Sequence, residues 1–180
     1  VVSRSALISI LGAIGLWQQY KKDPETLVRA ALRCKSDAIF FISGEGELKT
    51  KLVEMARGHD NIRIQGFMPK EFVPQAYAAA DIFAFPSEME TQGVVLLEAM
   101  SAETPCISTD VGIGRDVCAP ENVIGFKDDK ALAARIDALL SDDKAREQLG
   151  KEGRKLVEDE YTMEAMVRKL GDLYEGLCRR

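Results

Sequence analysis

The amino-acid sequence predicts an α/β fold with a doubly wound parallel sheet, in which helices cover both faces. Short apolar, β-rich segments alternate with amphipathic segments of helical period, the order that a parallel sheet requires. The expected strands are Ala6–Ile14, Ala38–Ser43, Ile62–Gln65, Ile82–Phe85, Cys106–Ser108 and Val123–Phe126. The expected helices are Pro24–Cys34, Leu48–Arg57, Phe72–Ala80, Gly93–Ala102 and Lys130–Leu140. Asp23 and Pro24 mark the first helix as an N-cap followed by proline at the first helical position.

The length and composition agree with one globular domain. The chain has 180 residues, of which 46% are hydrophobic and 29% charged, enough to bury a core. Its most apolar stretch, Ala6–Trp17, is too short for a transmembrane helix and lacks the flanks of a signal peptide. We therefore expect no transmembrane segment and a cytoplasmic location, and leave membrane association open for a full-length protein.

The tail of the chain differs from the part before it. From Asp142 onward the sequence predicts two charged amphipathic helices, Lys144–Asp159 and Thr162–Leu177. No internal repeat or Pro/Ser-rich linker divides the chain. We expect residues 1–142 to form the sheet domain, and residues 143–180 to form a helical extension packed on the same domain.

Charge and cysteine usage exclude several classes of function. The net charge is −5 and the pI about 5.1, which argues against a nucleic-acid partner but leaves room for a small anionic ligand at a helix N-terminus. The four cysteines are far apart and form no CxxC pair, so we expect reduced structural thiols and neither a metal site nor disulfides. His59, the only histidine, lies in a polar turn at the opposite end of the sheet from the expected ligand loops. A His-dependent nucleophile is therefore not expected.

Ligands of an open parallel sheet bind beyond the carboxyl ends of its strands. After the first strand, Lys21 and Lys22 precede the helix that begins at Pro24; they form either a phosphate site or ordinary solvated charges. After the second strand, Gly44 and Gly46 either let the backbone approach a ligand or only make a tight turn. After the third strand, the loop with Phe67 and Met68 could stack on or enclose a flat base, or Phe67 could instead cap the core.

The loop after the fourth strand runs into a helix through Thr91, Gln92, Gly93 and Val94. A helix that begins near Gln92 directs its free N–H groups at the loop edge, where they can hold a diphosphate without a metal. Glu98 returns by helical period to the side of Thr91. A buried carboxylate there needs hydrogen-bond donors, such as the hydroxyls of a ribose or hexose. The alternative is a structural carboxylate bonded to backbone amides or to Arg115.

Four segments together resemble a known family. The segments are Ala80–Ser87, Glu90–Met100, Thr104-Pro105 and Thr109–Gly112. In these segments the sequence resembles the C-terminal, donor-binding domain of retaining GT-B glycosyltransferases of the "group 1" family. The resemblance covers essentially the whole chain, and the two glutamates eight positions apart, with their lead-in, are its most specific part. It implies a Rossmann-like fold that is one half of a two-domain enzyme.

The resemblance also implies roles for individual residues. Glu90 would be catalytic and contact the hydroxyls of the donor sugar, and Glu98 would bind the ribose. The backbone of Gln92–Val94 would hold the diphosphate, and the Phe67-Met68 loop would contact the base. The donor would be a nucleoside-diphosphate sugar, with no cofactor or metal. The acceptor, a glycan or lipid, would be bound by an N-terminal domain that this sequence lacks, so the isolated domain should bind the donor but barely turn over.

The sequence departs from the family at two places. The family usually carries an arginine four or five residues before the lysine that matches Lys22, where this chain has Leu16 and Trp17. Loss of that guanidinium weakens the expected grip on the diphosphate. Glu103 replaces a frequent glycine before Pro105. A non-catalytic nucleotide-binding or regulatory module is therefore the alternative function, and a sugar-nucleotide epimerase half agrees less well with the two glutamates.

Overall fold

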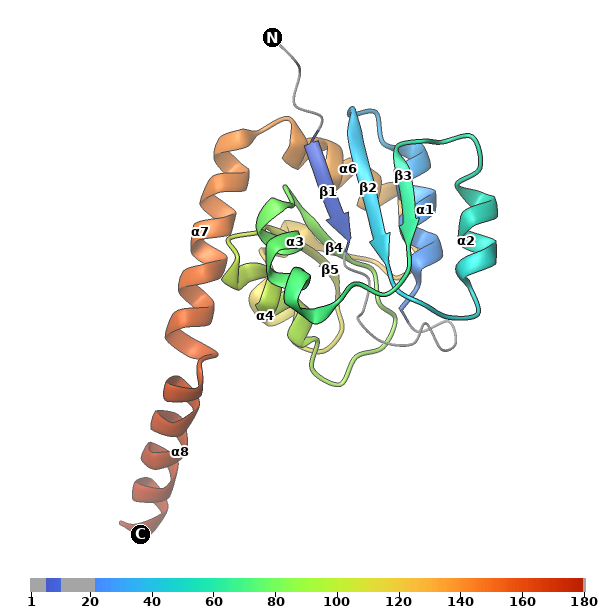
Figure 1. Ribbon diagram of the computed structural model, residues 1–180. Coiled ribbons are helices and arrows are strands. Elements are labelled where there is room, and N and C mark those ends of the chain that lie inside the picture. The colour runs from blue at the N-terminus through green and yellow to red at the C-terminus, as the bar shows by residue number, and fades with distance from the viewer. Residues whose placement is uncertain (1–5, 11–21, 180) are drawn as a thin grey trace.

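The computed structural model describes residues 6–10 and 22–179 (Figure 1). The strands in these ranges are β1 (Ala6–Ile10), β2 (Ala38–Ser43), β3 (Ile62–Gln65), β4 (Phe83–Phe85), β5 (Cys106–Thr109) and β6 (Val123–Ile124). The longer helices are α1 (Pro24–Arg33), α2 (Lys49–Met55), α3 (Val73–Ala79), α4 (Val94–Ser101), α6 (Asp129–Leu140), α7 (Asp143–Glu160) and α8 (Met163–Cys178). Short helical turns occur at η1 (Lys70–Phe72), α5 (Gly114–Val117) and η2 (Pro120–Asn122).

The strands confirm the predicted parallel α/β architecture. β1, β2 and β3 pair in parallel in that order, and β4, β5 and β6 do the same. β1 lies beside β4, so the spatial order is β3-β2-β1-β4-β5-β6 (Figure 1). The order reverses between β1 and β4, and that is where an open α/β sheet forms its ligand crevice.

Two hydrophobic cores, one on each face of the sheet, hold the helices in place. Along β4 the side chains alternate: Ile82 and Ala84 enter the core that α1, α2 and α6 share, while Phe83 and Phe85 enter the core of α3, α4 and α7. This alternation is the period-2 geometry of a strand. Because both faces are covered, the strand reads as a continuous apolar run, and the predicted helices on both faces are confirmed.

Side-chain caps set most of the long helix starts. Asp23 accepts a hydrogen bond from the backbone N–H of Thr26 at 3.1 Å, so the predicted start of α1 is confirmed. Asp128, Asp142 and Thr162 cap α6, α7 and α8 in the same way. Each cap satisfies an N–H group that has no partner inside the helix.

Some predicted boundaries differ from the structure. β1 is described only to Ile10, and residues 11–14 of the predicted strand lie outside the described part. The predicted strand Val123–Phe126 ends at Ile124, because the chain turns where the N–H of Asp128 donates to the carbonyl of Gly125 at 3.3 Å. The sequence did not predict η1, α5 and η2, since three or four residues are too few to display a helical period.

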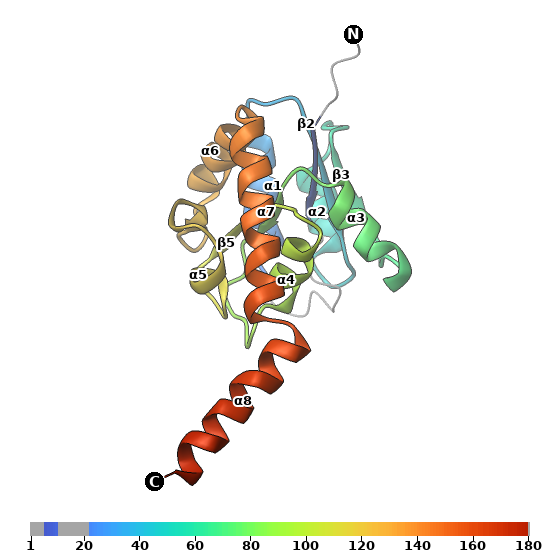
Figure 2. The same cartoon turned by 90° about the vertical axis from the view of Figure 1, so that its left-hand side faces the viewer.

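The last two helices differ in their packing. α7 lies against α4, where a Cβ atom at Gly153 would approach Met100 Cγ to 3.2 Å, so glycine permits the close contact. α8 extends away from the body (Figures 1 and 2), and Ala165 is its only buried residue within the described range. Its exposed apolar residues are Met163, Met166, Val167, Leu170, Leu173, Tyr174 and Leu177. No described helix is both long and apolar enough to cross a membrane. The division of the chain at residue 142 stays a prediction.

Asp137 on α6 stabilises the turn between α1 and β2 by hydrogen bonds. Its carboxylate accepts from the amides of Lys35 and Ser36 at 3.1 and 2.9 Å and from the Ser36 hydroxyl at 2.7 Å. Burial alone would raise the pKa of Asp137, but these hydrogen bonds lower it below its ordinary value. A carboxyl whose pKa is lower in the folded state adds stability above its unfolded pKa, and that stability is lost as pH falls through the folded pKa.

We therefore expect Asp137→Asn to lower the free energy of unfolding by about 1–2 kcal/mol at pH 7, with a smaller loss near pH 3. Urea unfolding of both proteins at several pH values measures the difference. A loss of stability that is the same at pH 3 and pH 7 would show that the ionised carboxylate has no special role.

Glu103, at the departure from the family's glycine, adopts the left-handed conformation that glycine favours, with φ of 60°. The turn forms nevertheless: the N–H groups of Glu103 and Thr104 donate to the carbonyls of Met100 and Ala99 at 2.9 and 3.1 Å, closing the end of α4. A residue with a Cβ pays about 1–2 kcal/mol for this conformation. The Glu103 carboxylate forms an ion pair with Arg154 at 3.5 Å, and because both side chains are exposed this pair adds little stability.

Glu103→Gly is expected to raise the free energy of unfolding by about 0.5–1 kcal/mol, because relief of the backbone strain exceeds the added chain entropy. Glu103→Ala loses the same ion pair but keeps the strain, so it should not stabilise the protein. Thermal or urea unfolding compares the two variants. Equal stability of the glycine and alanine variants would contradict the prediction.

Candidate functional site

The loops that the sequence singled out meet at one edge of the sheet. Because the strands are parallel, the segments after β1, β2, β3 and β4 all leave at their carboxyl ends, the lower edge of the sheet in Figure 1. Lys22 follows β1 in the chain, the Gly44–Gly46 turn follows β2, the Phe67-Met68 loop follows β3, and the segment to Gly93 follows β4. Residues 11–21, which include Leu16, Trp17 and Lys21, lie outside the described residues.

At this edge the structure brings Lys22 and Glu90 together across 68 positions of sequence. The Lys22 ammonium forms an ion pair with Glu90 Oε1, and the Ser87 hydroxyl lies 3.1 Å from the same oxygen. Lys22 Nζ also lies 5.4 Å from the centroid of the Phe85 ring. The side chains of Lys22 and Glu90 are 29% and 12% exposed, so the pair is partly withdrawn from solvent.

Helix α4 begins beside this ion pair. Its N-cap is Gly93, which has a φ of 82°. Because glycine has no side chain, it cannot cap the helix in the way that Asp23 caps α1. Thr91 and Gln92 are exposed and Val94 is 47% exposed. The helix begins at Val94, one residue after the start of the predicted helix Gly93–Ala102. The N–H of Leu96 donates to the carbonyl of Gly93 at 3.0 Å, and the N–H groups of Val94 and Val95 are left for solvent or for an anion.

The loop after β5 supports the Glu90–Gly93 segment from behind. The N–H of Ile113 donates to the carbonyl of Gln92 at 3.0 Å, and the Thr109 hydroxyl donates to the carbonyl of Ser87. Gly112 has φ of 52°, and a Cβ atom there would overlap the Gln92 carbonyl and lie 3.3 Å from Glu90 Cβ. Only glycine fits this position without moving the segment.

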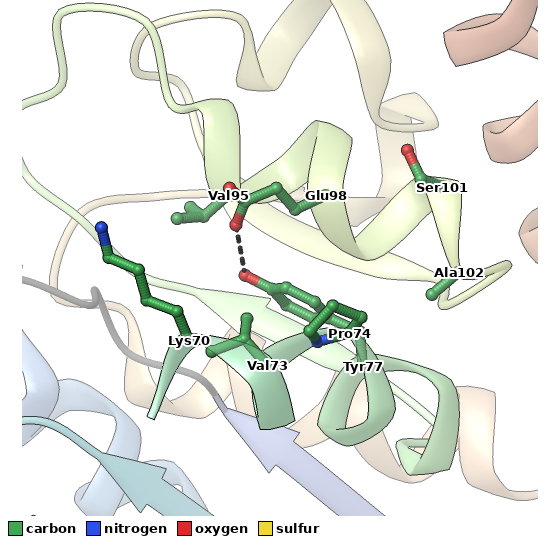
Figure 3. Close-up of a pocket in the computed structure, with 8 residues that line it drawn as sticks. All are labelled: Lys70, Val73, Pro74, Tyr77, Val95, Glu98, Ser101 and Ala102. Carbon is green, nitrogen blue, oxygen red and sulfur yellow. Dashed lines mark hydrogen bonds between the residues drawn. The ribbon is translucent and has the colours of Figure 1, made fainter. Parts of the chain in front are cut away.

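Glu98 lies at the mouth of a cavity between α3 and α4 (Figure 3). The prediction that its carboxylate is buried was wrong: Glu98 is exposed, because α4 buries Leu96, Ala99 and Met100 on its other side. Glu98 Oε2 accepts a hydrogen bond from the Tyr77 hydroxyl at 3.2 Å. Arg115, the alternative partner, instead forms an ion pair with Asp110.

The cavity has a volume of about 750 Å³ and is lined by both apolar and polar side chains. Its lining residues are Lys70, Val73, Pro74, Tyr77, Val95, Glu98, Ser101 and Ala102. Sequence reasoning missed Tyr77, Lys70 and Ser87 as site residues. Tyr77 could have been noticed, since it lies four residues after Val73 on the inner side of a helix and a buried tyrosine hydroxyl needs a partner. The partner depends on how α3 and α4 pack, which the sequence does not state.

The remaining predicted residues have plainer surroundings. Phe67 is 54% exposed and so does not cap the core, whereas Met68 packs against the core of α3 and α4. Neither is among the described residues that line the cavity. Gly44 and Gly46 form the turn from β2 to α2, where the N–H of Gly44 donates to the Gln65 carbonyl at 3.3 Å and the N–H of Lys49 donates to the Gly46 carbonyl at 3.1 Å.

The four cysteines and the histidine have the following surroundings in the structure. All four cysteines are free. Burial raises the pKa of the Cys34 and Cys118 thiols to about 12, so neither is a thiolate at neutral pH. His59 is exposed, in the turn that leads into the start of β3. Within the described ranges, no group of three or more His, Cys, Asp or Glu side chains is placed to hold a metal ion.

Comparison with known proteins relates this chain to glycosyltransferases by a family model and by curated relatives. The family model of glycosyl transferases group 1 matches residues 18–156. The sulfoquinovosyl transferase SQD2 of Arabidopsis thaliana is 31% identical over 170 residues, which are 91% of this chain and 32% of the relative. The chain spans less than half of the length of curated relatives that it matches, for example 28% of the capsular polysaccharide biosynthesis glycosyltransferase CapM of Staphylococcus aureus.

Two solved structures illustrate the similarity of fold. Sucrose-phosphate synthase from Thermosynechococcus elongatus has a TM-score of 0.81 and 26% identity, over 97% of this chain and 46% of that one. Anabaena HepE in complex with UDP and glucose has a TM-score of 0.81 and 15% identity, over 96% of this chain and 48% of that one. The strand order, the Glu90–Glu98 segment and the family match agree: this chain belongs to the group 1 glycosyl transferases and has the fold of the C-terminal half of a GT-B glycosyltransferase.

Proposed function

We propose that this chain binds a nucleoside-diphosphate sugar and is the donor half of an enzyme that transfers the sugar with retention and without a metal ion. The observation that carries the proposal is the Lys22–Glu90 ion pair beside the uncapped start of α4. The cation and the free N–H groups match the diphosphate of such a donor, and the carboxylate matches the hydroxyls of its sugar.

The leaving diphosphate is where negative charge develops during transfer. The Lys22 ammonium and the N–H groups of the first turn of α4 would stabilise that charge in place of a metal ion. Glu90 would accept hydrogen bonds from the sugar hydroxyls, with Ser87 holding its carboxylate in position. In the ligand-free chain Lys22 and Glu90 neutralise each other, so a bound diphosphate must compete with Glu90 for the ammonium.

The nucleoside would extend toward the cavity between α3 and α4. Glu98 at its mouth would accept hydrogen bonds from the ribose hydroxyls, and the exposed Phe67 with Met68 would contact the base. The Gly44–Gly46 turn would let the backbone come close to the ligand from the β2 side. HepE, whose fold is similar, was solved with UDP and glucose, and this supports a nucleotide as the ligand class.

The acceptor, a glycan or lipid, would be bound by a part of the protein outside this chain. The relatives have more than half of their length outside the matched segment. The matched relatives are named as transferases of different sugars, so the donor sugar and the acceptor are left open by the family. A cytoplasmic location stays a prediction.

One observation favours a second candidate, a nucleotide-binding module without catalysis. Leu16 and Trp17 stand where the family usually carries an arginine, which leaves Lys22 as the basic side chain described at the diphosphate position. Both candidates bind a nucleotide. They differ in whether the full-length protein transfers the sugar to an acceptor.

Isothermal titration of the 180-residue chain with UDP-, GDP- and ADP-sugars in the presence of EDTA tests the proposal. One nucleotide sugar is expected to bind with one site per chain, and added Mg²⁺ should not tighten binding. If a folded chain binds none of the three, the donor-site proposal is wrong. Binding by the chain, combined with no transfer by the full-length protein to glycan or lipid acceptors, would favour the non-catalytic module.

A further inference from the structure

We infer that Tyr77 is a positioning residue of the donor site, whose hydroxyl fixes the Glu98 carboxylate in the orientation that receives the vicinal diol of a ribose. This inference rests on the proposed function, because it concerns the nucleotide that the site would bind. The observation behind it is the 3.2 Å hydrogen bond from the Tyr77 hydroxyl to Glu98 Oε2 across 21 positions of sequence.

Tyr77 is held on several sides by its surroundings. Its side chain is 1% exposed, and its ring packs edge-on against Phe83 of β4, with centroids 5.4 Å apart and an interplanar angle of 86°. Its backbone carbonyl accepts a hydrogen bond from the Thr104 hydroxyl at 2.8 Å, which joins the end of α3 to the turn before β5. The phenol oxygen therefore has little freedom to move.

The Tyr77 hydroxyl can act only as a donor toward the carboxylate. Burial, and then the charge of Glu98, raise the pKa of Tyr77 well above its ordinary value, so the phenol keeps its proton at physiological pH. Glu98 itself is an exposed glutamate on a helix, a side chain that otherwise samples several rotamers. A bond from a rigid donor selects one rotamer before any ligand arrives.

The bond leaves part of the carboxylate available. A carboxylate has two oxygens and about four acceptor positions, and Tyr77 uses one of them on Oε2. Both residues line the cavity between α3 and α4, and the Tyr77 hydroxyl points at the Glu98 carboxylate there (Figure 3). Two adjacent hydroxyls, as on a ribose, can donate to Oε1 and to the second acceptor position of Oε2. A 2′,3′-dideoxyribose lacks both hydroxyls and cannot form these hydrogen bonds.

The test uses Tyr77→Phe, which keeps the ring on Phe83 and removes only the hydroxyl. The probes are UDP, GDP and ADP, and the 2′,3′-dideoxy form of the one that the unmodified chain binds, with affinity measured by isothermal titration. We expect Tyr77→Phe to weaken ribonucleotide binding about three- to tenfold and to leave dideoxynucleotide binding unchanged. In a Glu98→Ala background, Tyr77→Phe should have no further effect on affinity, because its effect passes through that carboxylate.

Two other variants separate positioning from a structural role. Tyr174→Phe removes an exposed hydroxyl from α8 and should change neither affinity. Glu98→Asp keeps the charge at an exposed position but shortens the side chain, so it should reproduce the selective loss even if Tyr77→Phe proves unstable in thermal unfolding.

The outcomes distinguish this inference from the proposed function. Equal ribonucleotide binding by the unmodified chain and Tyr77→Phe, an equal loss for both nucleotide forms, or a full loss in the Glu98→Ala background would each overturn the positioning role while leaving the donor site intact. If a folded unmodified chain binds none of the three nucleotides, the proposed function and the inference both fail.

Discussion

Replacing Lys22 with methionine is expected to weaken binding of a nucleoside diphosphate about 10- to 100-fold, corresponding to about 1.5–3 kcal/mol for a lost charged hydrogen bond. The methionine has an aliphatic side chain of similar length and removes the ammonium that lies 5.4 Å from the centroid of the Phe85 ring. The effect should be large because the chain carries a net charge of −5, so a diphosphate depends on local cations and helix N–H groups.

The partner variant Glu90→Gln separates the two halves of the ion pair. It frees the Lys22 ammonium from its carboxylate, so the affinity for a nucleoside diphosphate should stay the same or rise. The affinity for the intact nucleotide sugar should fall relative to it, because the contacts of the Glu90 carboxylate to the sugar hydroxyls are lost. Titration of both ligands into both variants measures the contrast. Lys155→Met, on the exposed surface of α7, is the matched control. If Lys22→Met binds the diphosphate as well as the unmodified chain does, Lys22 has no place in the donor site.

Gly112→Ala is expected to lower the free energy of unfolding by about 2–4 kcal/mol. The left-handed backbone costs a residue with a Cβ about 1–2 kcal/mol, and the overlap with the Gln92 carbonyl adds about 1–2 kcal/mol of forced movement. Because the displaced segment runs from Glu90 to Gly93, nucleotide binding should weaken together with stability. Urea unfolding and titration of the same variant measure the two effects.

Gly58→Ala is the matched control for this substitution. Gly58 also has a left-handed backbone, with φ of 82°, but a Cβ atom there would meet nothing within 4 Å. It should cost only the conformational part, about 1–2 kcal/mol, and should leave nucleotide binding unchanged. Equal stability losses at Gly58 and Gly112 would mean that the close approach to Gln92 is not important.

Most of the fold could be predicted, because a parallel α/β sheet shows in the sequence as short apolar segments that alternate with amphipathic helical segments. The segment Ala38–Ser43 forms β2 with the predicted bounds, and Asp23 caps α1 as its sequence position indicates. Short elements such as α5 were missed, since four residues form one turn and depend on the Gly112 loop before them. β6 is shorter than predicted, because its apolar run continues into a turn at Gly125.

The site could be predicted only in part. The loops that follow parallel strands must meet at one edge, so the sequence indicates which residues gather there. It does not indicate which ones touch: Lys22 and Glu90 were expected as separate ligand contacts, but they pair with each other. Glu98 was expected to be buried because its neighbours are apolar. Leu96, Ala99 and Met100 define the inner side of α4, and Glu98 lies on the opposite side, where it meets Tyr77 from another helix.

A nucleotide sugar is expected to bind where Lys22, Glu90 and the start of α4 meet. Amide chemical-shift mapping of the ¹⁵N-labelled chain tests it most directly, with the nucleotide sugar that binds by titration added in the presence of EDTA. We expect the largest shifts on the amides of Gly93, Val94 and Val95 and smaller ones at Gly112. The amides around His59, at the other edge of the sheet, should not shift. Saturable shifts centred on His59, with Gly93–Val95 unchanged, would contradict this binding site.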